Sequence, residues 1–278
     1  MFSTLISVAE LNAERLRSTA RIVDCRFDLM SPEAAEAAYL ASHIPGAVYA
    51  HLARDLSGPP HTDRGRHPLP SAARLRAVFA QFGINAHTQV VAYDAAGGGL
   101  AAARLWWLLR YMGHDRVAVL DGGWQAWLAA ALPHTQGREH VPLAEFIGAP
   151  RAARVVQLDE VPGMIGLVDA REPRRFRGEV EPIDPRAGHI PGAGNHYWQH
   201  NLDREGRFLT PSKLKEAFRD SLGTLPGAAS VHYCGSGVSA CHNVLAQVQA
   251  GLPEPRVYCG SWSEWCRAPE RPAATGAA

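Results

Sequence analysis

The residues best suited to chemistry are a cysteine and the short loop that follows it. Cys234 comes directly after an apolar run at 229–233 and opens the stretch Cys-Gly-Ser-Gly-Val-Ser. Gly235 and Gly237 permit the dihedral angles of a tight loop, and Ser239 can cap a helix that follows. Backbone amides that converge at such a strand-to-helix junction form an anion cradle. We therefore predict that this uncharged loop stabilises a thiolate at Cys234 with backbone dipoles.

The usual alternative is a cysteine that only fills the core at the end of a strand. The two glycines directly after Cys234 favour the reactive interpretation there. For Cys241, on the apolar stripe of its expected helix, and for Cys259 we expect core filling. His232 shares a strand face with Cys234 and could mark a base, but a buried sheet histidine is the favoured interpretation.

The elements that must position this cysteine belong to a doubled unit. Four motifs of the first half return in the same order in the second: IVDCR (22–26) as LVDAR (167–171), SHIPGA (42–47) as GHIPGA (188–193), VAYD (91–94) as VHYC (231–234), and DGGWQAW (121–127) as CGSWSEW (259–265). Such an ordered repeat indicates an old duplication with length changes in its loops. At the place of Cys234 the first half carries Asp94, so only the second copy can supply a nucleophile.

Each half alternates short apolar strands with amphipathic helices. Strands are expected within 21–25, 89–93, 116–120, 165–169, 229–233 and 255–258, and helices at 72–82, 100–111, 211–222 and 238–250. Strands that are apolar on both faces are typical of a parallel sheet covered by helices. The sequence thus predicts an α/β fold with two domains, 1–137 and 154–278, joined by a linker at 138–153.

The composition is that of a globular chain with balanced charge. Its 278 residues contain 46% hydrophobic residues, and 28 Lys and Arg balance 27 Asp and Glu. This balance argues against nucleic acid as a partner, and we expect no membrane association. The five cysteines are odd in number and form no CxxC pair, which favours a reducing, cytoplasmic location. We expect neither a metal nor another cofactor, because no Cys/His cluster has ligand spacing.

These motifs resemble the tandem-domain rhodanese and 3-mercaptopyruvate sulfurtransferase family over nearly the whole chain. The likeness rests on CGSGVSAC (234–241), the two HIPGA copies, the paired VDxR strand ends and GSWSEW (260–265). It implies two tandem rhodanese-like domains, of which only the second is catalytic. It also implies that Cys234 takes a sulfane sulfur from a small-molecule donor and holds it as a persulfide. A thiol, a protein thiol or cyanide then accepts the sulfur.

The form of the loop indicates the donor. Thiosulfate-preferring relatives resemble CRKGV, with two cations for a dianion, whereas mercaptopyruvate-preferring relatives resemble CGSGV, the form found here. The resemblance implies that arginines between VDxR and HIPGA bind the keto acid. Arg175 matches the first of these and Arg186 is the candidate for the second. The expected donor site comprises Arg175, Arg186, Gly235, Gly237, Val238 and Ser239.

The resemblance further implies a relay of a loop serine with a histidine and an aspartate. Ser236 supplies the serine, and His67, in GRHPLP (65–70), matches the histidine. Asp55 is the candidate acid, because His51 and Ala53 stand where relatives carry acids. A loop histidine without catalytic function is the alternative for His67. The predicted catalytic residues are therefore Cys234, Ser236 and His67.

Three other functions are alternatives, and the phosphatase among them is disfavoured. Thiosulfate is the second candidate donor. A phosphatase built on the same fold would need an arginine six residues after the cysteine, where this chain has Ala240. A non-catalytic sulfur-carrier or binding module is the third alternative, since a fold does not fix a function.

Overall fold

The chain folds into two compact units, each with its own sheet. The computed structural model describes residues 1–16, 20–29 and 31–277. One unit comprises Met1–Gly58, Pro70–Arg151 and Arg204–Phe208, and the other comprises Pro59–Leu69, Ala152–Asp203 and Leu209–Ala278. The short segment that carries His67 therefore groups with the unit that carries Cys234.

The first unit is built on a five-stranded parallel sheet in the order β1-β5-β4-β2-β3. Its elements are β1 (Leu5–Ile6), α1 (Val8–Leu16), β2 (Ala20–Asp24), α2 (Pro32–Ala41), β3 (Val48–Tyr49), α3 (Leu52–Asp55), α4 (Ala72–Gln81), β4 (Gln89–Tyr93), α5 (Ala102–Tyr111), β5 (Val117–Leu120) and α6 (Gly123–Ala129).

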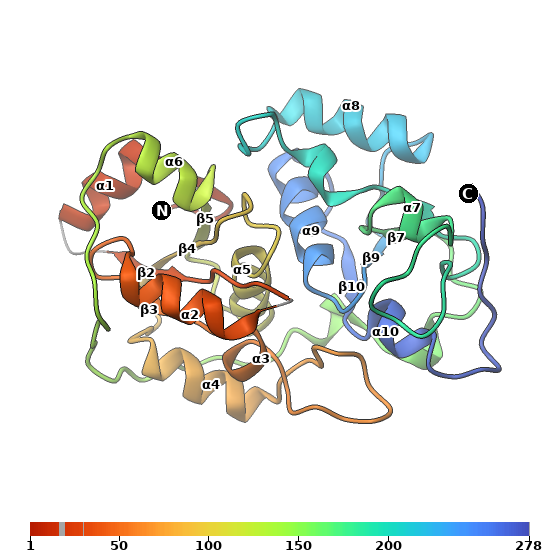
Figure 1. Ribbon diagram of the computed structural model, residues 1–278, viewed down its shortest axis with the longest axis horizontal. Coiled ribbons are helices and arrows are strands. Elements are labelled where there is room, and N and C mark those ends of the chain that lie inside the picture. Colours follow the sequence, from red (N-terminus) through yellow and green to blue (C-terminus); the bar gives the residue numbers. More distant parts are fainter. Residues whose placement is uncertain (17–19, 30, 278) are drawn as a thin grey trace. The chain divides into compact units, whose positions relative to one another are not determined.

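The second unit repeats this topology in a sheet of the order β6-β10-β9-β7-β8, again parallel throughout. Its elements are η1 (Ala152–Arg154), β6 (Val155–Val156), η2 (Leu158–Glu160), β7 (Leu167–Asp169), α7 (Pro173–Phe176), β8 (Gly194–Asn195), η3 (Trp198–Asn201), α8 (Pro211–Leu222), β9 (Val231–Tyr233), α9 (Ser239–Gln249), β10 (Arg256–Tyr258) and α10 (Ser261–Trp265). Figure 1 shows helices packed around the strands of each unit.

The apolar strands predicted from the sequence form these sheets, which confirms the predicted α/β fold. Every residue of β4 and of β9 is buried, so the strands that lead to Asp94 and to Cys234 run through the core. In a parallel sheet the carboxyl ends of the strands meet at one edge, where ligands bind in many α/β proteins. The loop after β9 thus opens at the edge of the sheet where a site is expected.

The duplicated motifs make the same contacts in both units. Arg26 donates to both carboxylate oxygens of Asp24, and Arg171 does the same to Asp169. In the HIPGA turns, Nδ1 of His43 lies 2.8 Å from a backbone carbonyl oxygen, and Nδ1 of His189 lies 2.7 Å from another. These buried histidines fix the turns, which agrees with a structural role for the motif.

Within the described ranges, none of the helices combines the length and the hydrophobicity that a membrane span requires.

Candidate active site

Cys234 lies where β9 ends, and two backbone hydrogen bonds hold it in place. Its amide donates to Oγ of Ser261 at 3.1 Å, and its carbonyl accepts from the amide of Trp262 at 2.9 Å. Both partners belong to α10. Only 2% of the residue is exposed, so the sulfur lies beneath the groups that surround the loop.

One amide of the loop points directly at the sulfur. The backbone N–H of Gly237 donates to Sγ of Cys234 at 3.1 Å. Gly237 has φ +76°, and a Cβ at this position would collide with the carbonyl oxygen of Cys259. Only glycine fits here without strain. The sequence therefore folds this loop so that a main-chain dipole supports negative charge on the sulfur.

The equivalent loop of the first unit also directs backbone amides at the residue that follows the strand, which there is an aspartate. Asp94 follows β4 as Cys234 follows β9, and its side chain is completely buried. Its two carboxylate oxygens accept hydrogen bonds, at 2.8 to 3.1 Å, from five amides of the loop and of the first residue of α5: Ala96, Gly98, Leu100, Ala101 and Ala102. A strand–loop–helix junction of this fold thus gathers amides around one negative charge.

Two guanidinium groups from other segments lie over the loop, beside the cysteine. A Cβ at Gly235 would lie 2.9 Å from Nη2 of Arg66 and 3.7 Å from Nη1 of Arg175. Arg175 was expected at the site from the sequence. Arg66 was missed, although it directly precedes His67 in the same motif. Two arginines therefore lie at the loop in addition to the backbone dipoles that the loop sequence predicted.

An acidic pair binds these arginines. Asp184 forms ion pairs with Arg66 and, at 3.3 Å, with Arg175, while Glu181 accepts from Nη2 of Arg175 at 2.7 Å. The side chains of Asp184 and Glu181 are only 3% and 4% exposed. Burial raises the pKa of Asp184, although Arg66 opposes that change. Neither acid was expected at the site from the sequence.

His67 meets Ser236 at the same loop. Nδ1 of His67 lies 2.8 Å from Oγ of Ser236, and both residues are buried. Contacts with the end of the chain hold the segment of His67 in place: the amide of Arg66 donates to Oγ of Ser263, and Arg267 donates to the carbonyl oxygens of His61 and Thr62. The structure thus brings together the two side chains that the sequence paired.

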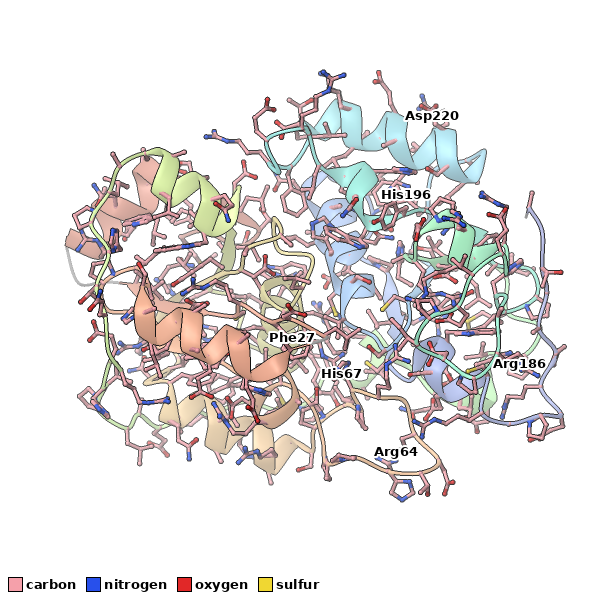
Figure 2. The ribbon with its side chains drawn as sticks, viewed as in Figure 1. Phe27, Arg64, His67, Arg186, His196 and Asp220 are labelled. Atoms are coloured by element: carbon pink, nitrogen blue, oxygen red, sulfur yellow. The ribbon has the colours of Figure 1, made fainter. Side chains whose placement is uncertain are left out.

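The other predicted residues have different surroundings. Arg186 donates to the carbonyl oxygens of Arg271 and Pro269, and Figure 2 shows it well away from His67. Val238 occupies the N-cap position of α9, and Ser239 is the first residue of that helix. The prediction that Ser239 caps the helix is wrong, because the helix begins one residue earlier than a serine cap requires.

Two further candidates have structural surroundings. Nε2 of His232 lies 2.9 Å from Oε1 of Gln247, and burial lowers the pKa of His232 to about 3. This agrees with a sheet histidine rather than a base. The carboxylate of Asp55 accepts from the amide of His51 and from Arg54 within the first unit. In the described part of the chain, no three His, Cys, Asp or Glu side chains gather as metal ligands.

Comparisons with known proteins show which proteins the chain is similar to. The model of the rhodanese-like domain matches residues 7–130 and 152–268, one match in each half. A protein of Pseudomonas aeruginosa named a probable 3-mercaptopyruvate sulfurtransferase is 46% identical over 98% of both chains. A putative thiosulfate sulfurtransferase of Mycobacterium tuberculosis is 38% identical over 99% of this chain and 98% of its own.

Among solved structures, the 3-mercaptopyruvate sulfurtransferase from Leishmania major superposes with a TM-score of 0.84 at 29% identity. The similarity covers 95% of this chain and 74% of that one. Sequence and structure therefore point to the same group of proteins.

Proposed function

The chain belongs to the family of tandem rhodanese-like sulfurtransferases, and from that premise we propose that Cys234 carries the sulfur it transfers. The donor is 3-mercaptopyruvate, and the acceptor is a thiol, a protein thiol or cyanide. The single observation that carries this proposal is the amide of Gly237, which donates to Sγ of Cys234 at 3.1 Å. A sulfur anion at this position gains the support that a nucleophile and a persulfide both need.

The proposed reaction has two displacement steps at sulfur. In the first, the Cys234 thiolate attacks the donor sulfur, an S–S bond forms, and the carbon–sulfur bond breaks to release the enolate of pyruvate. This enolate takes up one proton to give pyruvate. In the second, the acceptor thiolate attacks the outer sulfur, and the Cys234 thiolate leaves. No external oxidant or reductant is required.

The pair formed by Ser236 and His67 is placed to handle the proton of the first step. A hydroxyl group in contact with an imidazole can deliver a proton and recover it from the ring. The distance of 2.8 Å between Oγ of Ser236 and Nδ1 of His67 supports this role. In the proposal, the pair protonates the leaving enolate.

The carboxylate of the donor binds to guanidinium groups beside the loop. Arg175 and Arg66 support this assignment, because both lie within 4 Å of a Cβ at Gly235. Amides of the loop residues Gly237, Val238 and Ser239 complete the donor site in the proposal. A substrate-binding role for Arg186 stays a prediction, and its contacts with Pro269 and Arg271 favour a structural role.

Thiosulfate is the second candidate donor, and one observation favours it. The loop lacks cations of its own, but Arg66 and Arg175 bring two positive charges to it from other segments. Steady-state kinetics with both donors, side by side, decide between them. We expect the higher kcat/KM for 3-mercaptopyruvate, and a clear preference for thiosulfate would reverse the assignment.

A Cys234→Ser variant tests catalysis itself. We expect it to lose cyanide-dependent turnover with either donor, and full turnover in this variant would contradict the role of Cys234. A non-catalytic sulfur carrier would show no turnover in the unmodified protein.

The remaining partners and the location extend the proposal. The family implies a sulfur donor and a thiol acceptor. The balanced charge of the chain supports small molecules and proteins as partners, rather than nucleic acid or a membrane. A cytoplasmic location stays a prediction.

A further inference from the structure

Ion pairs bind the two arginines that lie over the cysteine loop. Arg66 and Arg175 approach Gly235 from two segments, and one carboxylate, that of Asp184, binds both of them. The carboxylate of Glu181 also binds Arg175 and accepts hydrogen bonds from its Nε and Nη2. Each of the two guanidinium groups over the loop therefore already has a carboxylate partner.

Hydrogen bonds from the backbone to the side chain of Glu181 hold Asp184 in this position. Its amide donates to Oε1 of Glu181 at 3.1 Å, and the amide of Ile183 donates to the same oxygen at 3.1 Å. Pro182 and Pro185 flank these two residues and restrict the backbone further. The side chain is 3% exposed, so its carboxylate is a fixed part of the site rather than a mobile surface charge.

The carboxylate of Asp184 has the chemistry of the donor's own carboxylate. Guanidinium groups bind any carboxylate through the same N–H donors. A donor that uses Arg66 or Arg175 must therefore compete with Asp184 for them.

We propose that Asp184 is a specificity-determining residue, which occupies the anion subsite for the donor and selects a singly charged carboxylate over a dianion. The inference rests on the proposed function, because it concerns the donor subsite of that reaction. A fixed negative charge repels a dianion about twice as strongly as a monoanion at the same distance. Asp184 therefore favours a keto acid over thiosulfate, although two arginines are present.

The test measures the access of anions to Cys234 without any sulfur donor. Iodoacetate and iodoacetamide both alkylate a thiolate and release iodide, but only iodoacetate carries a carboxylate. Alkylation of the peptide that contains Cys234 is followed by mass spectrometry, and the ratio of the iodoacetate rate to the iodoacetamide rate is compared between variants. Because neither reagent depends on turnover, this result is independent of whether the proposed reaction occurs.

In Asp184→Asn we expect this ratio to rise about tenfold, since one negative charge leaves a buried site. Asp184→Glu keeps the charge and should keep the ratio of the unmodified protein. Asp159→Asn removes an exposed acid from the same unit, and it should also leave the ratio unchanged. An unchanged ratio in Asp184→Asn, or an equal rise in Asp159→Asn, would overturn the inference.

A second variant covers the case in which Asp184→Asn does not fold. Arg66→Gln removes the cation that Asp184 binds, and we expect the ratio to fall about tenfold. An unchanged ratio in this variant would also overturn the inference.

Donor kinetics give a further readout. In Asp184→Asn the ratio of kcat/KM for thiosulfate to that for 3-mercaptopyruvate should rise, and a fall in this ratio would contradict the selectivity that we assign to Asp184.

Discussion

Nδ1 of His67 lies 2.8 Å from Oγ of Ser236, although the two residues are 169 positions apart in the sequence. Ser236 belongs to the cysteine loop, while His67 reaches it on a segment held by Ser263 and Arg267. The contact of these two buried side chains requires that the segment of His67 keeps a fixed position against the cysteine loop. It places the Ser236–His67 contact two residues after Cys234, where the proposed reaction needs a proton.

If this pair acts as one unit, removing either member should have the same effect. We expect Ser236→Ala and His67→Ala each to lower kcat with 3-mercaptopyruvate about 100-fold. The double variant should be no slower than the worse single variant, because the interaction is already lost. Alkylation of Cys234 by iodoacetamide serves as the control and should stay unchanged. Multiplicative losses in the double variant would contradict a shared role.

Gly237 is the position at which the loop is least tolerant of a side chain. Its φ of +76° and the nearby carbonyl of Cys259 leave no room for a Cβ. Gly237→Ala should therefore move the amide away from Sγ of Cys234 and lower kcat/KM about 100-fold, within the range seen when one such donor is lost. Gly251→Ala is the matched control, because Gly251 has φ +71° with open space around it. Equal activity in the two variants would contradict the importance of this amide.

Asp94 should matter for stability rather than for catalysis. Asp94→Ala leaves five N–H groups, three of them buried, without their acceptor, so the free energy of unfolding of the first unit should fall by about 3 to 5 kcal/mol. Urea unfolding followed by tryptophan fluorescence measures this loss. Glu145→Ala, which removes an exposed acid of the same unit, is the control and should change stability little. A loss below about 1 kcal/mol for Asp94→Ala would contradict the cradle.

Two buried histidines predict a loss of stability in acid. Burial lowers the pKa of His196 to about 4 and that of His232 to about 3, against 6.5 in the unfolded chain. Between pH 6.5 and these lower values the unfolded state binds protons that the folded state excludes, so stability falls as the pH falls. Each histidine contributes up to about 1.4 kcal/mol per pH unit.

His232→Gln should therefore unfold with a shallower dependence on pH, measured by urea titrations between about pH 6.5 and about pH 4. His61→Gln removes an imidazole that is 55% exposed, and its stability should change with pH as that of the unmodified protein does. Identical slopes for all three proteins would refute the assignment.

Much of the fold follows from local pattern. The runs QVVAY (89–93) and VHY (231–233) are apolar on both faces, and a strand of this kind is stable only inside a covered sheet. Helical spacing predicted a helix at 211–222, and α8 has these bounds, with a proline at its start and Gly223 at its end. Repetition of the motifs then predicted two similar units.

The charged network around the cysteine could not be predicted in the same way. Arg66, Glu181 and Asp184 lie in irregular segments, where no periodic pattern indicates which side chains meet. The segment at 59–69 was expected in the first domain, yet its contacts with Ser263 and Arg267 group it with the second unit. Such tertiary contacts leave no local signature in the sequence. The position of Arg66 beside His67 was the one available signal.

The most direct measurement of the central claim is the mass of the peptide that contains Cys234. After incubation with 3-mercaptopyruvate and no acceptor, followed by removal of the donor, we predict that this peptide gains the mass of one sulfur atom. The gain should disappear on addition of cyanide, with stoichiometric formation of thiocyanate. If a preparation that turns over when cyanide is supplied gave a peptide of unchanged mass, this would contradict the account, as would a sulfur found on another cysteine.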